Sequence, residues 1–172
     1  AKNALSSSSI DPETIDYIIL AHNIGDVCSN SNQVDAMPSL ASRVKSKLKI
    51  KNPNCVAYDI LFGCPGWLEG LIQSNCFIKA GIAKRCLVIG SETLSRVIDS
   101  SDRDGMIFSD GAGAVVTEYN NDNNGILSHK TVTYTYDSEI DYIFYGKSNG
   151  INSDNTKYIK MQGRKVYEFA LN

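Results

Sequence analysis

Three short runs of apolar residues alternate with stretches of helical periodicity, and this alternation constrains the fold most. The runs cover residues 17–21, 55–60 and 86–90. Each has the length of a buried strand and is bounded by turn-forming residues. Strands that are apolar on both faces are typical of parallel sheets covered by helices on both sides. The sequence therefore predicts an α/β fold with a layered core.

Two helices are predicted between these runs. Apolar positions recur at helical spacing over residues 37–48, and Pro38 occupies a first-turn position that tolerates proline. The second pattern covers residues 68–79, and Gly81 ends it. Residues 22–36 between the first run and the first helix are polar and rich in Asn and Ser, which predicts a loop.

The rest of the chain gives weaker patterns. Residues 125–136 alternate Thr, Val and Tyr and are expected to be β-rich, whereas residues 137–160 are polar and predict a long excursion. We expect residues 110–113, Asp-Gly-Ala-Gly, to form a tight turn rather than a phosphate-binding loop, because Val116 replaces the third glycine of G-x-G-x-x-G and a strand-like run follows. Residues 1–8 resemble the end of a helix, and an amphipathic helix begins at Met161. These abrupt ends predict an internal piece of a longer protein.

Composition and charge exclude several classes of function. The 172 residues are 42% hydrophobic, enough for a sizeable core, and the formal net charge of −2 favours neither nucleic acid nor anionic membrane as a partner. No apolar run approaches the roughly 18–20 residues of a membrane span. The five cysteines form no C-x-x-C pair, which argues against a zinc knuckle or a thioredoxin-type dithiol. Their odd number and irregular spacing favour a reduced, cytoplasmic protein with mostly buried thiols.

Cys64 lies at a predicted strand-to-helix corner. Gly63 and Gly66 permit a tight turn after the second apolar run, with Cys64 at the helix cap and Pro65 at the first helical position. The free amides and positive dipole end of a helix favour an anion there, and the thiolate is the nucleophilic form of cysteine. Local features alone leave open a small buried cysteine in a turn.

Several motifs resemble, in order along the chain, β-ketoacyl-acyl-carrier-protein synthase III, a thiolase-fold condensing enzyme. The nucleophile region of that family is similar to VAYDILFGCPGW, residues 56–67. Four further segments match in sequence order: IKAG at 78–81, CLVIGSE at 86–92, Asp102-Arg103 with SDGAGAVV at 109–116, and MQGRKVY at 161–167. The resemblance covers nearly the whole chain.

The resemblance implies a thiolase-like fold in which a layered mixed sheet is covered by helices. Two such halves make up the family's usual architecture, and this chain would be one half, incomplete at both ends. Residues 1–160 would form the N-terminal half with the nucleophilic cysteine, including the polar excursion at about 137–160. Residues 161–172 would be the truncated start of the C-terminal half.

The resemblance also implies an acyltransferase. Cys64 would take an acyl group from acyl-CoA and condense it with malonyl-acyl-carrier-protein, with loss of carbon dioxide, in fatty-acid or polyketide biosynthesis. Arg103 would pack against the adenine end of coenzyme A, and Gly163 and Tyr167 would line the pantetheine tunnel, where Phe is usual at the Tyr167 position. Coenzyme A is then a substrate, and no permanently bound cofactor or metal is expected. The implied partners are acyl-CoA, acyl carrier protein and a second copy of the chain in a homodimer.

Departures from the family pattern leave alternatives open. Pro65 and Trp67 replace a small residue and Phe, which would reshape the acyl pocket. The family's catalytic histidine and asparagine lie in the C-terminal half, and His22 and His129 match neither, so both are expected to be structural or solvated. We therefore expect these residues alone to be inactive in condensation. Non-decarboxylating acyl transfer and a non-catalytic scaffold or partner subunit are the alternative functions.

Two clusters of charged residues have simpler interpretations. The lysines at 45, 47, 49 and 51 are interpreted as a solvated helix end, with docking of an acidic carrier protein as the alternative. Asp99, Asp102, Asp104 and Asp110 have the spacing of turn residues rather than of a metal site.

Overall fold

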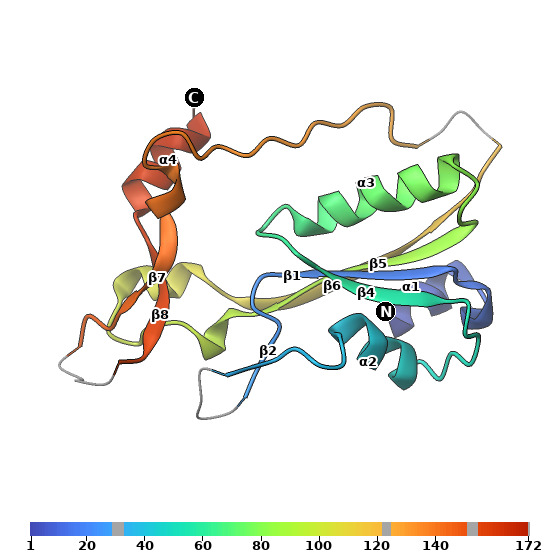
Figure 1. Ribbon diagram of the computed structural model, residues 1–172, viewed down its shortest axis with the longest axis horizontal. Coiled ribbons are helices and arrows are strands. Elements are labelled where there is room, and N and C mark those ends of the chain that lie inside the picture. Colours follow the sequence, from blue (N-terminus) through green and yellow to red (C-terminus); the bar gives the residue numbers. More distant parts are fainter. Residues whose placement is uncertain (29–32, 122–124, 151–154, 172) are drawn as a thin grey trace.

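The structure, a computed structural model, describes residues 1–28, 33–121, 125–150 and 155–171. These residues form a central four-stranded mixed sheet (Figure 1). Its order is β4 (Val56–Leu61), β1 (Tyr17–His22), β5 (Arg85–Thr93) and β6 (Asp110–Glu118). β1 runs parallel to both of its neighbours, and β6 is antiparallel to β5. The three predicted strands are confirmed as β1, β4 and β5, but only β1 and the first half of β5 are buried. The expected burial of the second strand is wrong, because β4 is an edge strand whose residues are all exposed or half-buried.

Helices cover both faces of the sheet. α3 (Gly66–Lys79) lies on one face, and α1 (Lys2–Ser8) and α2 (Leu40–Lys47) lie on the other (Figure 1). α2 begins later than the apolar pattern suggested, because the Ser39 side chain caps its N-terminus by accepting from the backbone N–H of Ser42. The predicted α/β layered fold is confirmed.

The main core lies between the sheet and the two helices α1 and α2. Apolar side chains that are almost completely buried meet there, among them Ile15, Ile18, Leu20, Ala41 and Leu87. Burying one such large aliphatic side chain stabilises the fold by about 1.5–3 kcal/mol. The continuous apolar runs of the sequence therefore build the layer that holds the sheet together.

On the other face of the sheet, the backbone of α3 lies very close to the strands. Gly66, Gly70 and Ser74 occupy successive turns of that helix and are all buried. A Cβ on Gly70 would lie 2.9 Å from Cγ1 of Val88 in β5, closer than real contacts allow. The Ser74 hydroxyl lies 2.5 Å from the hydroxyl of Thr117 in β6. Small side chains on this face thus let α3 lie directly on the strands.

The segment expected to be a loop holds a short hairpin. β2 (Asp26–Val27) and β3 (Val34–Asp35) pair antiparallel. Arg43 of α2 joins them, because its guanidinium contacts Asp26 at 3.3 Å and Asp35 at 2.8 Å. Two residues per strand are too few for the sequence pattern to reveal.

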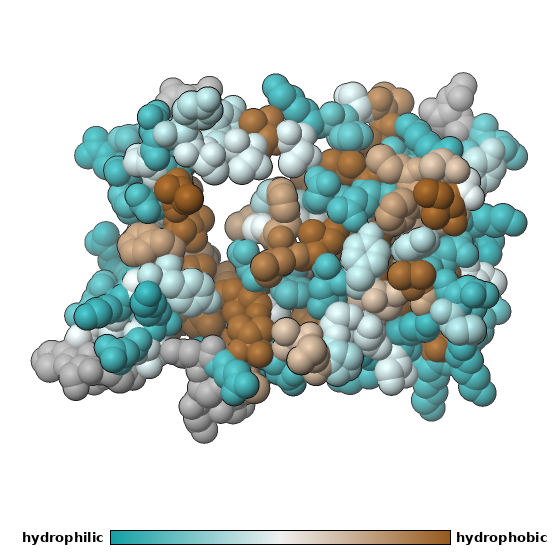
Figure 2. All heavy atoms as spheres, viewed as in Figure 1, coloured by the Kyte–Doolittle hydropathy of each residue, from teal (hydrophilic) through white to brown (hydrophobic). Residues whose placement is uncertain are grey.

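The polar excursion is largely a second hairpin, β7 (Ile143–Lys147) and β8 (Lys157–Met161), followed by α4 (Gly163–Leu171). Together they form a lobe beside the sheet (Figure 1). Val27, Val97 and Ile159 form a small buried cluster where this lobe meets the rest of the molecule. Figure 2 shows apolar atoms gathered along the same boundary. The lobe is therefore packed against the sheet domain rather than only tethered to it.

Two expectations about β structure are wrong. Residues 125–136 form no strand, and Leu127, Val132 and Tyr134 are exposed, because no neighbouring strand in the described chain offers hydrogen-bond partners. Residues 110–113 are not a tight turn: they open β6, where they pair with residues 90–93 of β5. Pairing with a long neighbour overrides the turn preference of the two glycines.

Short 3-10 helices complete the description. They are η1 (Pro12–Thr14), η2 (Leu94–Arg96), η3 (Arg103–Ile107) and η4 (Glu139–Asp141). Across the described ranges, no helix combines the length and apolar character needed to cross a membrane.

Candidate active site

Cys64 lies in the corner between β4 and α3. The corner is fixed to the end of β1, since the backbone N–H of Phe62 donates to the carbonyl of His22 at 3.2 Å. The N–H of Gly66 closes the turn by donating to the carbonyl of Gly63 at 2.8 Å. A Cβ on Gly66 would lie 3.0 Å from that of Ala21. Glycine at this position thus lets the helix start directly over the end of β1.

The helix begins one residue later than expected. Pro65 is the N-cap and Gly66 the first helical residue, so Cys64 immediately precedes the cap instead of forming it. The Cys64 side chain is exposed. The local alternative of a small buried cysteine is therefore wrong.

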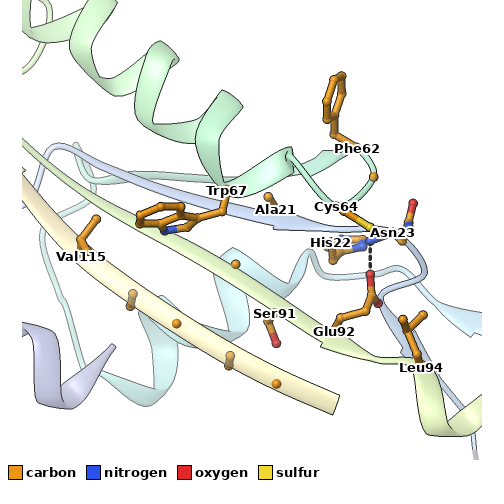
Figure 3. Close-up of a pocket in the computed structure, with 16 residues that line it drawn as sticks. Ala21, His22, Asn23, Phe62, Cys64, Trp67, Ser91, Glu92, Leu94 and Val115 are labelled. Atoms are coloured by element: carbon orange, nitrogen blue, oxygen red, sulfur yellow. Dashed lines mark hydrogen bonds between the residues drawn. The ribbon is translucent and has the colours of Figure 1, made fainter. Parts of the chain in front are cut away.

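A cavity of about 540 Å³ opens at this corner. It lies at the carboxyl ends of β1, β4 and β5, the edge at which α/β sheets generally bind ligands. Figure 3 shows the Cys64 sulfur near His22 and Asn23, with Trp67 further along the sheet. Other lining residues come from the β4–α3 corner, β5 and the following turn, and β6: Phe62, Gly63, Gly90, Ser91, Glu92, Leu94 and residues 111–115.

Trp67 forms one wall of the cavity. A Cβ on Gly90 would lie 3.1 Å from Cβ of Trp67, so the absence of a side chain at Gly90 makes room for the indole. Its ring nitrogen is buried without a hydrogen-bond partner among the described residues. On β6, nothing lies within 4 Å of a Cβ on Gly111 or Gly113, which leaves that side of the cavity open.

His22 is not solvated, and its contacts agree with the structural role that was one of the two expected from the sequence. Its Nε2 lies 3.2 Å from Oδ2 of Asp59, and only 12% of its side chain is exposed. The Asp59 carboxylate also accepts the backbone N–H groups of Leu40 and Ala41, both at 2.8 Å, at the N-terminus of α2. The sequence pointed to no partner for His22, because Asp59 is 37 positions away and only strand pairing brings the two together.

Glu92 is the carboxylate that lines the Cys64 cavity itself. Oε2 of Glu92 accepts the backbone N–H of Asn23 at 2.6 Å (Figure 3). Its other oxygen is buried and has no partner within the described part of the chain, and the same holds for Nδ1 of His22. Burial, and secondarily the charge of Glu92, raises the pKa of Tyr145 on β7.

The other predicted site residues lie elsewhere. Arg103 is the first residue of η3 and is exposed, Gly163 opens α4, and 65% of Tyr167 is exposed. A Cβ on Gly163 would lie 3.8 Å from a carboxylate oxygen of Asp104, so η3 and the start of α4 are neighbours. None of the three lines the cavity at Cys64.

The remaining cysteines divide by burial. Cys55 and Cys86 are buried as expected, and burial raises the pKa of both thiols. Cys28 is exposed, as a loop residue should be. Cys76 is also exposed, because it lies on the outer side of α3, and its assignment to the buried helix pattern is wrong.

The basic cluster is solvated as expected at Lys47, Lys49 and Lys51, which are exposed, but not at Lys45. The Lys45 ammonium donates to the carbonyls of Asn52 and Cys55 at 2.8 and 2.6 Å, so it fastens the loop that follows α2 instead of extending into solvent. Asp110 accepts from the backbone and hydroxyl of Ser95. In the described ranges no three His, Cys, Asp or Glu side chains are grouped so that they could hold a metal ion.

Comparison with known proteins agrees with this geometry. The family model for 3-oxoacyl-[acyl-carrier-protein (ACP)] synthase III matches residues 58–135. β-Ketoacyl-[acyl-carrier-protein] synthase III of Methylococcus capsulatus is 35% identical over 173 residues, which cover 100% of this chain and 50% of that protein. The Neisseria meningitidis protein of the same name is 37% identical over 176 residues, covering 99% and 50%.

Solved structures give the same result. The crystal structure of 3-oxoacyl-[acyl-carrier-protein] synthase III from Aquifex aeolicus has a TM-score of 0.77 at 35% identity, covering 98% of this chain and 49% of that one. The Thermus thermophilus synthase III has a TM-score of 0.76 at 29% identity, covering 99% and 50%. The chain thus spans about half the length of the curated relatives that it matches.

The mixed sheet between helices, with a cysteine at the strand-to-helix corner, defines a thiolase-like fold. Within that class the chain is similar over almost its whole length to proteins named β-ketoacyl-acyl-carrier-protein synthase III, and it matches about half of their length.

Proposed function

We propose that the protein to which this chain contributes is a condensing acyltransferase with Cys64 as its covalent nucleophile. The observation that carries the proposal is the exposed Cys64 thiol at the mouth of a 540 Å³ cavity, in the corner between β4 and α3. Relatives named β-ketoacyl-acyl-carrier-protein synthase III support the same class. The reaction serves fatty-acid or polyketide biosynthesis.

The first half-reaction is a thioester exchange. The Cys64 thiolate adds to the carbonyl of acyl-CoA, the bond between carbonyl carbon and coenzyme A sulfur breaks, and the acyl group remains on Cys64. The resemblance assigns stabilisation of the tetrahedral oxyanion in part to the backbone amide of Cys64. Trp67 bounds the space into which the acyl chain extends.

The second half-reaction forms a carbon–carbon bond. Malonyl-acyl-carrier-protein loses carbon dioxide, and the resulting carbanion attacks the acyl thioester and releases the Cys64 thiolate. The family's histidine and asparagine assist this decarboxylation from the C-terminal half, to which neither His22 nor His129 corresponds. Residues 1–172 alone are therefore inactive in condensation.

Coenzyme A binding is assigned to the neighbouring starts of η3 and α4. Arg103 packs against the adenine end, and Gly163 and Tyr167 line the pantetheine channel. The proximity of Gly163 to Asp104 supports a shared site, since it brings these two elements together. Residues 1–160 then form the N-terminal half, and residues 161–172 begin the C-terminal half. The protein is a homodimer, and acyl carrier protein binds to it during the reaction.

Intact mass spectrometry tests the nucleophile. The full-length protein is incubated with acetyl-CoA and its mass is measured, with Cys64→Ala and Cys76→Ala as a matched pair of exposed-cysteine variants. We expect one acetyl adduct on the wild type and on Cys76→Ala, and none on Cys64→Ala. An unmodified wild type, or an adduct that survives Cys64→Ala, refutes the proposal.

A further inference from the structure

A histidine–aspartate pair lies directly beside the corner that carries Cys64. His22 and Cys64 line the same cavity (Figure 3), and the hydrogen bond from Phe62 to the His22 carbonyl fixes the corner to the end of β1. Asp59 is the partner of Leu20 in the parallel register between β4 and β1, so its side chain reaches His22 two residues further along.

Asp59 holds the imidazole of His22 in place. Its carboxylate accepts two backbone N–H groups at the start of α2, which fixes the orientation of the carboxylate. In the tautomer whose Nε2 donates to Asp59, Nδ1 of His22 is a lone-pair acceptor.

That acceptor is not used by the described fold. Nδ1 of His22 is buried and has no hydrogen-bond partner among the residues that the structure describes. Buried polar atoms are normally satisfied, so an exception at the edge of a cavity calls for an explanation, and a catalytic role is one of them. Cys64 is a nucleophile that lines the same cavity as His22.

We propose that His22, oriented by Asp59, is the proton acceptor for the Cys64 thiol. This rests on the proposed function only in taking Cys64 as the nucleophile. No hydrogen bond joins the two side chains in the described structure, so in this proposal the proton passes from Sγ to the imidazole by way of solvent in the cavity that both line. The imidazolium then returns the proton to the departing coenzyme A thiolate, which leaves as the free thiol.

Three groups face His22 besides Cys64. Asp59 comes from β4, Glu92 of β5 lies on the same cavity, and Tyr145 of β7 lines a second cavity behind the ring together with His22 and Asp59. The two carboxylates stabilise the imidazolium formed when the thiol loses its proton. In this proposal the proton acceptor for acyl transfer to Cys64 is a residue of β1.

The test compares two reactions of Cys64 in the full-length protein between pH 5.5 and 9. Alkylation by iodoacetamide requires only a reactive thiolate, and acetylation by acetyl-CoA also requires substrate binding. Peptide mass spectrometry follows Cys64 separately from the other thiols. The variant is His22→Gln, because glutamine retains a donor for Asp59 and has no basic nitrogen. His129→Gln is the matched control, since His129 is exposed.

We expect His22→Gln to slow both reactions at neutral pH by roughly 10²-fold, the lower end for general-base catalysis, and to remove an inflection on the acid side of the profile. His129→Gln should leave both profiles unchanged. Acetylation at the wild-type rate in folded His22→Gln overturns the role of His22 and leaves Cys64 as the nucleophile.

The opposite outcome separates the two proposals. If acetyl-CoA never modifies Cys64 but alkylation of Cys64 still depends on His22, the proposed function is wrong. The role of His22 as proton acceptor for the Cys64 thiol is then still supported. If His22→Gln does not fold, the wild-type alkylation profile decides: a single titration near the free-thiol value of about 8.5 overturns the proposal.

Discussion

The ammonium of Lys160 in β8 lies 2.6 Å from a carboxylate oxygen of Asp99, and the two side chains are only 9% and 3% exposed. Lys160 also contacts Asp102 at 2.8 Å and the side-chain oxygen of Asn149 at 3.2 Å. Asp102 in turn caps η3 by accepting the N–H of Asp104. One lysine thus joins the β7–β8 hairpin to the turn that presents Arg103.

Replacing Lys160 should loosen this junction. Lys160→Met leaves two acceptor carboxylates without their cation, so we expect a lower unfolding midpoint and faster amide exchange in β7 and β8. Lys157→Met, at an exposed position of the same strand, should change neither. Thermal unfolding and hydrogen exchange measure the two effects, and equal behaviour of the variants would show that the junction is not stabilising.

Acid should act through the same carboxylates. The hydrogen bond from Lys160 lowers the pKa of Asp99, opposed by desolvation and aided by the N–H groups of Asn149 and Ser101. A depressed carboxyl pKa contributes stability that is fully present above the unfolded value of about 3.9 and is lost as the pH falls toward the folded pKa. We expect urea midpoints to decline below about pH 4.

The matched variant for that decline is Asp99→Asn. It removes the ionisable group, so its urea midpoint should be lower than that of the wild type near neutrality and should depend less on pH between about 2 and 5. A variant curve parallel to that of the wild type would assign the acid sensitivity to other carboxylates.

Gly70→Ala tests the close approach of α3 to the sheet. The added methyl would lie 2.9 Å from Val88, and overpacking of this kind costs about 1–3 kcal/mol. The gain in helix propensity of roughly 1 kcal/mol offsets part of that cost. We expect net destabilisation in urea unfolding, whereas Gly111→Ala should be nearly neutral because its Cβ meets nothing within 4 Å. If Gly70→Ala were more stable than the wild type, α3 could move away from the sheet without a loss of folding free energy.

Trp67→Phe tests the cavity wall. The indole nitrogen has no partner in the described structure, so removing it should change stability by less than about 1 kcal/mol. The smaller ring widens the cavity, and under the proposed function bulkier acyl groups should be transferred to Cys64 more readily relative to acetyl. Competition between acetyl-CoA and a branched acyl-CoA, followed by intact mass, measures that ratio. An unchanged ratio would place the acyl chain elsewhere.

Most of the central fold could be predicted from the sequence, because continuous apolar runs and helical spacing determine local structure directly. The strands β1, β4 and β5 and the corner at Cys64 follow from such patterns. The hairpin β7–β8 did not, since its two five-residue strands lie in a stretch that is polar overall and gain stability from Lys160 and Asp99, 61 positions apart. Residues 125–136 show the converse, an alternating pattern with no strand beside it.

The site was predicted only in part for the same reason. Cys64 stands out through its glycine-flanked corner, which is a local signal. The hydrogen bond between His22 and Asp59 arises from the parallel register of two strands, and their spacing in the sequence does not predict it. One signal was available: His22 ends one predicted strand, and Asp59 lies near the end of another. Comparing the polar residues at the ends of predicted parallel strands would have suggested this pair.

The buried face formed by Gly66, Gly70 and Ser74 restricts how this molecule can diverge. Because Gly66 and Gly70 have no side chain to shorten, the main chain of α3 already lies against the strands. The distance between Cys64 and the sheet is therefore fixed by backbone atoms. New substrate preferences must then come from substitutions of other cavity-lining residues such as Trp67, while the position of the Cys64 sulfur stays the same.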